Sequence, residues 1–168
     1  MSGAPTRPGV LFFLVAVGLA WAGVATTLVL AGEALVAVGA AASAFAFLAA
    51  AKVRAARSPR LLLAGAAAER AAEAMILGGI AWVALPERPG VVAAAMTALG
   101  ASYTATYLHI RAAGLGFRVG EPIWLRTAIW VAVAAGVVMG WVLWIAVALS
   151  TVDLAWGTAG VVREGERG

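Results

Sequence analysis

The chain has 168 residues, the length of one ordinary domain; 64% of them are hydrophobic and only 12% are charged. Because a soluble domain carries about 25% charged residues, this composition excludes a water-soluble globular protein and makes the lipid bilayer the expected environment. The net charge of +4 does not indicate a nucleic-acid partner, because the basic residues form short clusters between apolar runs, the pattern that sets membrane topology.

The apolar runs predict an all-α polytopic membrane protein, a bundle of six transmembrane helices in a single domain of residues 1–168. The expected spans cover about residues 10–30, 34–51, 61–85, 91–110, 123–138 and 141–162. The last two spans belong to one apolar stretch that, as a single helix, would be about 60 Å long. Since this length is too great for a single crossing of the bilayer, we place a break between Gly136 and Gly140.

The basic residues fall almost entirely on one side of these six spans. On that side lie Arg7, Lys52, Arg54, Arg57, Arg60, Arg111, Arg118, Arg126, Arg163 and Arg167. Only Arg88 falls on the other side, so the positive-inside rule predicts a multi-pass protein of the cell membrane with both termini in the cytoplasm. An alternative is a cleaved signal peptide ending near residues 20–22, although its apolar stretch is longer than the usual 7–15 residues.

The third predicted span contains three charged residues, Glu69, Arg70 and Glu73. Each costs roughly 2.5–3.5 kcal/mol on insertion scales, so the three need a structural or functional reason. Two carboxylates one helical turn apart are half of a site for Mg²⁺, which prefers oxygen ligands. Alternatively, Arg70 pairs with Glu73 and the group is structural. We expect the carboxylates near the cytoplasmic interface or in a wet cavity, close to Lys52.

Two further polar residues lie in the later spans. Asp153 is expected to line the same cavity or to act as an interfacial cap or ion-pair partner. His109 stands next to Arg111, and the simplest interpretation is an interfacial side chain that extends toward water, with metal ligation as the alternative.

The stretch from Lys52 to Glu73 resembles the signature of the CDP-alcohol phosphatidyltransferases, D-x2-D-G-x2-A-R followed by G-x3-D-x3-D. Ala56 and Arg57 look like its A-R pair, and Gly65, Glu69 and Glu73 stand at the G-x3-D-x3-D positions, with glutamate for aspartate twice. Residues 107–116 are similar to a second stretch that ends the fourth helix of actinobacterial members. The resemblance implies the six-helix fold of that family.

The resemblance also implies a chemistry, in which metal-bound carboxylates activate an alcohol that attacks the diphosphate of a CDP-linked donor and releases CMP. Glu73 would then be the catalytic base and Glu69 a catalytic metal ligand, with Mg²⁺ or Mn²⁺ held by Glu69 and Glu73. The residues implied for substrate or phosphate binding are Lys52, Arg54, Ala56, Arg57, Gly65 and Arg111. A CDP-linked lipid or alcohol would be the partner.

The sequence departs from the family pattern where the first two aspartates and the first glycine should stand. Those positions hold Ala49, Lys52 and Val53, so half of the metal ligands are missing. The ammonium of Lys52 is a candidate for the positive charge that the metals would supply, in which case no metal cofactor is needed. The leading hypothesis is a weakly active or non-catalytic homologue that serves as a lipid- or nucleotide-binding or partner subunit, in a homodimer or heteromeric membrane complex.

Two alternatives remain. One is a divergent but active transferase that acts on a CDP-linked donor in phospholipid biosynthesis. The other is a small transporter or proton-path protein that uses the charged groups of the third and sixth spans. The transporter hypothesis predicts a continuous polar route across the bilayer, because intramembrane ionisable residues commonly mark such paths.

Overall fold

The computed structural model of the chain describes residues 8–55, 59–117 and 122–166, and this part is entirely helical apart from short connections. The described residues form six α-helices and one 3-10 turn, which follow one another along the chain. They are α1 (Pro8–Leu30), α2 (Ala34–Ala55), α3 (Pro59–Ala84), α4 (Pro89–Gly114), α5 (Ile123–Gly136), η1 (Gly140–Val142) and α6 (Leu143–Gly165). The predicted all-α bundle is therefore confirmed.

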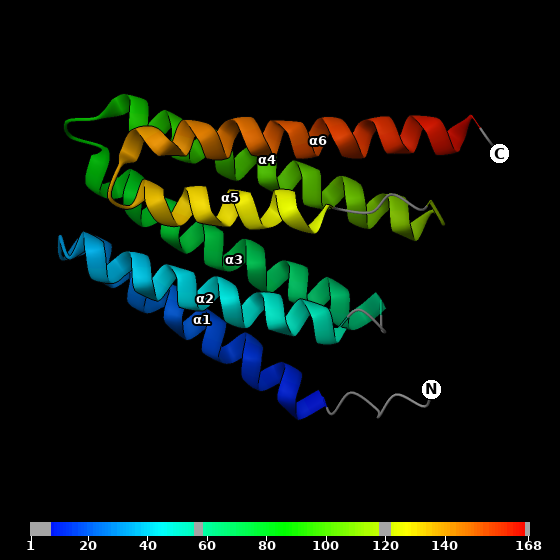
Figure 1. Cartoon of the computed structure of the whole chain (residues 1–168), viewed down its shortest axis with the longest axis horizontal. Helices are drawn as coiled ribbons and strands as arrows, with labels where there is room; N and C mark the ends of the chain where they lie inside the picture. The colour runs from blue at the N-terminus through cyan, green and yellow to red at the C-terminus, as the bar shows by residue number, and fades with distance from the viewer. Residues whose placement is uncertain (1–7, 56–58, 118–121, 167–168) are drawn as a thin grey trace.

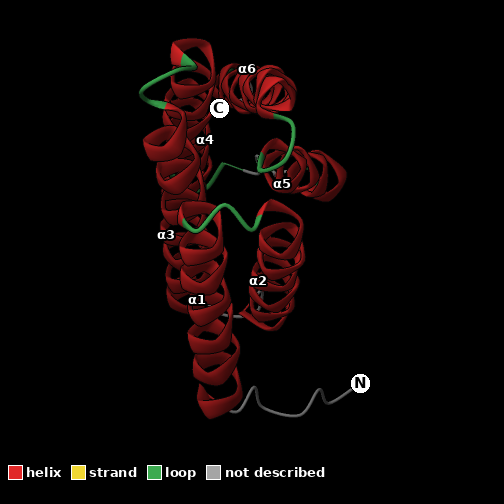
Figure 2. Ribbon diagram, turned by 90° about the vertical axis from the view of Figure 1, so that its left-hand side faces the viewer, coloured by secondary structure: helices red, strands yellow, loops and turns green. Residues whose placement is uncertain are grey.

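The helices form an elongated bundle of successive hairpins (Figures 1 and 2). The start of α1 and the end of α6 lie at the same end of the bundle, on the right in Figure 1. We call this end, where α2, α4 and α6 also finish, the basic end, because Lys52, Arg54, Arg111 and Arg163 occupy the last turns of those three helices. The connections α1–α2, α3–α4 and α5–α6 lie at the opposite end.

Four of the helices, α1, α2, α4 and α6, are long and apolar enough to cross a membrane, and α5 is a shorter apolar helix. The remaining helix, α3, has 26 residues but carries the internal charges. The expected break in the last apolar stretch is present, because α5 ends at Gly136 and η1 turns the chain into α6. The helix α1 continues without interruption through residues 20–22, and Ala22 is buried in the core.

Small residues allow the helices to pack closely, and alanines make up much of the buried core. A Cβ atom at Gly18 of α1 would lie 2.8 Å from a side-chain carbon of Leu48 in α2. At Gly65 in α3, it would lie 4.0 Å from the Cα atom of Lys52 in α2. This second approach brings the basic end of α2 against the charged part of α3, which positions the site described next.

Candidate functional site

The three charged residues of α3 are buried in the bundle rather than exposed in a cavity. Glu69 and Glu73 expose only 2% and 1% of their surface, and Arg70 is buried beside them. Their side chains contact neighbouring helices: Glu69 pairs with Lys52 of α2 and Arg126 of α5, and Arg70 and Glu73 hydrogen-bond to Ser102 of α4. The expected wet cavity is therefore wrong, because neighbouring helices enclose both carboxylates and charged side chains take the place of water around them. The alternative position near the cytoplasmic interface stays a prediction.

Glu73 has the most partners of the three. Its carboxylate contacts Arg70, with Nη1 2.6 Å from Oε2 and Nη2 2.9 Å from Oε1, so the predicted i,i+3 ion pair is confirmed. The hydroxyl of Ser102 in α4 donates to Oε2 at 2.9 Å, and the indole N–H of Trp130 in α5 donates to Oε1 at 3.1 Å. Both carboxylate oxygens of Glu73 thus accept hydrogen bonds from side chains on three helices.

Glu69 joins the cluster to α2. The ammonium of Lys52 lies 3.4 Å from Oε2 of Glu69, and the Lys52 side chain is 30% exposed. The sequence predicted this proximity between Lys52, at the end of α2, and the carboxylates of α3. The contact joins the two helices by an ion pair, however, and not through an open pocket.

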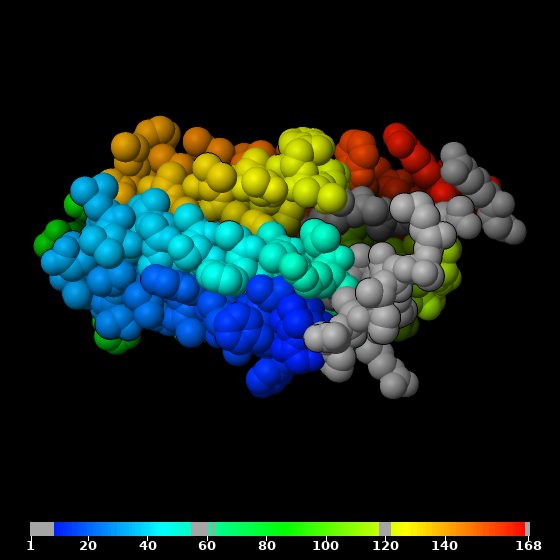
Figure 3. Space-filling view, turned by 60° about the horizontal axis from the view of Figure 1, so that its bottom comes forward, coloured from blue at the N-terminus to red at the C-terminus, as the bar shows by residue number. Residues whose placement is uncertain are grey.

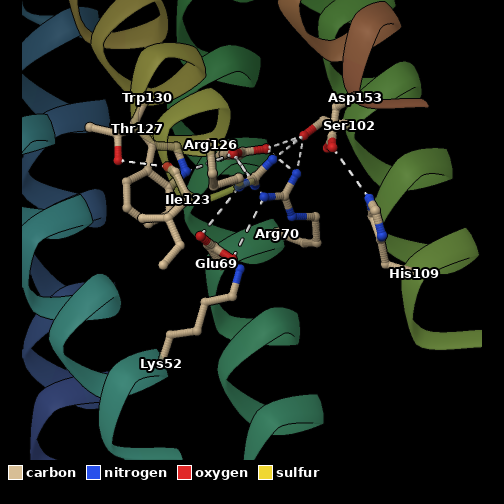
Figure 4. Close-up of polar contacts among 11 residues, drawn as sticks. Lys52, Glu69, Arg70, Ser102, His109, Ile123, Arg126, Thr127, Trp130 and Asp153 are labelled. Atoms are coloured by element: carbon tan, nitrogen blue, oxygen red, sulfur yellow. Dashed lines mark hydrogen bonds and ion pairs between the residues drawn. The ribbon is translucent and has the colours of Figure 1, made fainter. Parts of the chain in front are cut away.

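The cation that the sequence reasoning missed is Arg126, in the first turn of α5. The topology count treated it as a basic residue of the membrane surface, but it is 3% exposed and points into the bundle (Figure 4). Its Nε lies 3.3 Å from Oε1 of Glu69, and its Nη2 lies 2.5 Å from Oε1 of Glu73. One guanidinium therefore bridges the two carboxylates. In the sequence, the only sign that Arg126 points inward is its position one helical turn inside an apolar run.

Two uncharged residues that the sequence reasoning also missed complete the arrangement. The hydroxyl oxygen of Ser102 accepts hydrogen bonds from the guanidiniums of Arg70 and Arg126. The distance from Nη1 of Arg126 to this oxygen is 3.0 Å. Trp130 stacks on Phe45 of α2, with ring centroids 5.3 Å apart. We call Glu69, Arg70, Glu73, Ser102 and Arg126 the Glu–Arg cluster. No motif marks the serine or the tryptophan, because both acquire their role only through packing.

A second buried polar contact joins α4 to α6. His109 Nε2 lies 3.2 Å from Oδ1 of Asp153, and both side chains are buried (Figure 4). Asp153 contacts His109, which makes an ion pair when the imidazole is protonated, as one of its interpretations expected. The expectation that His109 extends toward water is wrong, because its side chain is buried. Gly157 of α6 makes room for the ring, since a Cβ atom there would lie 3.3 Å from Cε1 of His109.

The remaining residues implied for phosphate binding do not join the cluster. Arg54 is exposed, and its Nη1 donates to the carbonyl oxygen of Ala50 in its own helix at 3.4 Å. Arg111 is exposed at the end of α4. Ala56 and Arg57 lie outside the described residues. The structure therefore brings Lys52 and Gly65 to the two glutamates, while Arg54 and Arg111 lie on the surface.

The donor set around the two glutamates does not fit a divalent metal ion. All four carboxylate oxygens lie within 3.4 Å of a cationic nitrogen of Lys52, Arg70 or Arg126. A Mg²⁺ ion needs about six oxygen ligands at about 2.0–2.1 Å, and guanidiniums supply donors only. Within residues 8–55, 59–117 and 122–166, no three His, Asp or Glu side chains converge on a common point. The metal role implied for Glu69 and Glu73 therefore stays a prediction without geometric support.

The resemblance to the CDP-alcohol phosphatidyltransferases rests on the spacing of a few residues around Gly65, Glu69 and Glu73. When the chain is compared with models of protein families, with curated proteins and with solved structures, nothing matches it.

Proposed function

We propose that the protein is a six-span membrane protein of the CDP-alcohol phosphatidyltransferase type that binds lipid without transferring a phospho-group. The observation that carries this proposal is the occupation of both glutamates by arginine side chains. A general base must be free to accept a proton from its substrate. Glu73, the candidate base, instead accepts hydrogen bonds from four side chains on three helices.

Lipid binding is supported by an apolar groove between α2 and α5, with a volume of about 460 Å³. Phe45 and Trp130 form its aromatic wall, and Figure 3 shows the face of the molecule on which α2 (cyan) and α5 (yellow) lie side by side. The groove extends along α2 to Ala49, one helical turn before Lys52. We assign it to an acyl chain of a phospholipid, whose phosphate would lie near the partly exposed side chain of Lys52.

The alternative of a transporter or proton path finds little support in the distribution of polar groups. On α3, the buried side chains that follow Glu73 are all apolar, from Ile76 to Ala84. The buried residues of α4 before Ser102 and of α6 before Ser150 are likewise apolar. In the described part of the chain, a continuous apolar layer therefore separates the buried polar groups from the end of the bundle that carries the α3–α4 connection.

The catalytic part of the proposal is tested by CMP release. Purified protein in lipid nanodiscs is incubated with Mg²⁺ or Mn²⁺, a panel of CDP-linked lipids and alcohols, and acceptor alcohols. We expect no CMP above the level of empty nanodiscs. Metal-dependent release that the Glu73→Gln variant abolishes would establish the divergent transferase in place of the binding protein.

The lipid-binding part is tested with a phospholipid that carries a photoreactive group in its acyl chain. We expect crosslinks concentrated on the groove faces of α2 and α5, and we expect the substitution Ala46→Trp, which fills the groove, to reduce them. Ala93→Trp on the exposed surface of α4 is the matched control and should leave the crosslinks unchanged. Crosslinks spread evenly around the bundle, or equal effects of the two substitutions, would count against a lipid site in the groove.

The expected orientation can be measured directly because the chain contains no cysteine. A single cysteine at Glu87, in the α3–α4 connection, should react with a membrane-impermeant maleimide on intact cells. A cysteine at Glu166, after α6, should react only after the membrane is permeabilised. The reverse pattern would contradict the assignment of the basic end to the cytoplasm.

A further inference from the structure

Arg126 occupies the space that lies between the two carboxylates of α3. Its three guanidinium nitrogens have three different partners: Nε contacts Glu69 at 3.3 Å, Nη2 contacts Glu73 at 2.5 Å, and Nη1 donates to Ser102 at 3.0 Å. These partners belong to two helices other than its own. A planar group with diverging N–H donors suits this position, because it can satisfy several oxygen acceptors at once.

The other two cations contact the glutamates differently. Arg70 also reaches both of them, with Nη1 2.6 Å from Oε2 and Nη2 2.9 Å from Oε1 of Glu73, and with Nη2 3.8 Å from Oε2 of Glu69. Lys52 contacts Glu69 alone of the two glutamates and remains partly exposed. Among these cations, only Arg126 contacts the Oε1 atoms of both glutamates within 3.5 Å.

We infer that Arg126 is a built-in counter-cation, which fills the place between Glu69 and Glu73 and closes the carboxylate pair to divalent metal ions. The guanidinium cannot lose its charge in a protein, so it remains a competitor of any metal at this position. The sequence reasoning assigned this replacement to Lys52, whereas the geometry assigns it to Arg126. This inference rests on the same cluster as the proposed function, but it concerns metal exclusion and not lipid binding.

A consequence is that removal of the guanidinium should create a metal site that the natural protein lacks. In Arg126→Ala, Oε1 of Glu69 loses its cation and Oε1 of Glu73 keeps only Arg70, while the Ser102 hydroxyl remains as a third oxygen. Water can enter the space of the deleted side chain and complete the coordination. Mn²⁺ is the suitable probe, because carboxylate and hydroxyl oxygens suit it and its electron paramagnetic resonance signal distinguishes free from bound ions.

The experiment titrates Mn²⁺ into purified wild-type protein and Arg126→Ala, with resonance spectra and melting midpoints as the two readouts. We expect Arg126→Ala to bind one Mn²⁺ at least about tenfold more tightly than the wild type and to melt at a higher temperature with Mn²⁺ than with EDTA. The double variant Arg126→Ala/Glu73→Gln should lose this response. Lys52→Ala is the matched control: it removes another cation that contacts Glu69 but leaves the Arg126 guanidinium in place, and it should behave as the wild type does.

Two results would overturn the inference. The first is tight binding of Mn²⁺ by the wild type that Glu73→Gln abolishes, since the guanidinium would then not close the site. The second is a folded Arg126→Ala variant that binds Mn²⁺ no better than Lys52→Ala does. If Arg126→Ala does not fold, the wild-type titration and its Glu73→Gln control decide the question. CMP release and lipid crosslinking are measured separately, so failure of this inference is distinguishable from failure of the proposed function.

Discussion

The two buried polar contacts of the bundle differ in how completely their charges are satisfied. In the Glu–Arg cluster, both oxygens of each carboxylate face cationic nitrogens from neighbouring side chains. In the His109–Asp153 pair, only Oδ1 of Asp153 is engaged, and Oδ2 has no hydrogen-bond partner among the described residues. The comparison shows that burial alone does not make a charged residue necessary for stability. The loss of stability when a buried charge is removed depends on which partner groups are then left unpaired.

The largest expected effect comes from Glu73→Gln. This substitution keeps the shape of the side chain but leaves two buried guanidiniums facing a neutral amide, so the free energy of unfolding should fall by about 3–5 kcal/mol. Unfolding by SDS, followed by circular dichroism in mixed micelles, measures it. Glu87→Gln in the exposed α3–α4 connection is the control and should change stability by less than about 0.5 kcal/mol. Equal effects of the two would show that the cluster is energetically unimportant.

A smaller effect is expected for Trp130→Phe. The phenyl ring can still stack on Phe45, but the N–H donor to Glu73 is lost, which should cost about 1.5 kcal/mol because the acceptor is charged. The same unfolding assay applies. Trp82→Phe, at an exposed position of α3, removes the same N–H without a buried partner and should be close to neutral. A loss no greater than that of Trp82→Phe would argue that the hydrogen bond adds nothing to the cluster.

The packing around the second contact is tested by Gly157→Ala. The added methyl carbon would lie 3.1 Å from Cδ2 of Leu108 and 3.3 Å from Cε1 of His109, so these side chains must move by a few tenths of an ångström. Gly165→Ala adds the same atom in open space near the end of the same helix. We expect Gly157→Ala to be about 1 kcal/mol less stable than Gly165→Ala, because the crowded site has to rearrange. Equal stabilisation of α6 by the two substitutions would show that the space beside His109 accommodates a methyl group without rearrangement.

The smallest effect is expected for Asp153→Asn, the isosteric counterpart of Glu73→Gln. The amide carbonyl can keep the contact with His109, and the buried charge that lacks a second partner disappears. Stability should therefore change by about 0.5 kcal/mol or less, in either direction. A loss as large as that of Glu73→Gln would remove the contrast between the two contacts and place Asp153 among the charges that the bundle needs.

The helices of this fold could be predicted from sequence because each apolar run is bounded by polar or helix-breaking residues. The break after Gly136 followed from length alone, and the contact between Lys52 and Glu69 followed from the order of two adjacent helices. The i,i+3 contact between Arg70 and Glu73 was predictable in the same way, since it is local.

The side-chain contacts that could not be predicted depend on the relative rotation of helices that are far apart in the sequence. Arg126 lies 53 and 57 positions from its two glutamate partners, and its charge is equally consistent with a position at the membrane surface. Whether it points inward is decided by the packing of α5 against α3. His109 and Asp153, 44 positions apart, are a second example, because the rotation of α4 against α6 determines their contact.

The distance along the chain between α3 and Arg126 also has a consequence for biosynthesis. A ribosome makes α3, with both glutamates, well before it makes α5, so the nascent chain carries the acidic residues with only nearby basic groups to balance them. The Glu–Arg cluster becomes complete only when α5 arrives and packs beside α3. Arg126 is therefore the last charged residue of the Glu–Arg cluster to be synthesised, 53 residues after Glu73.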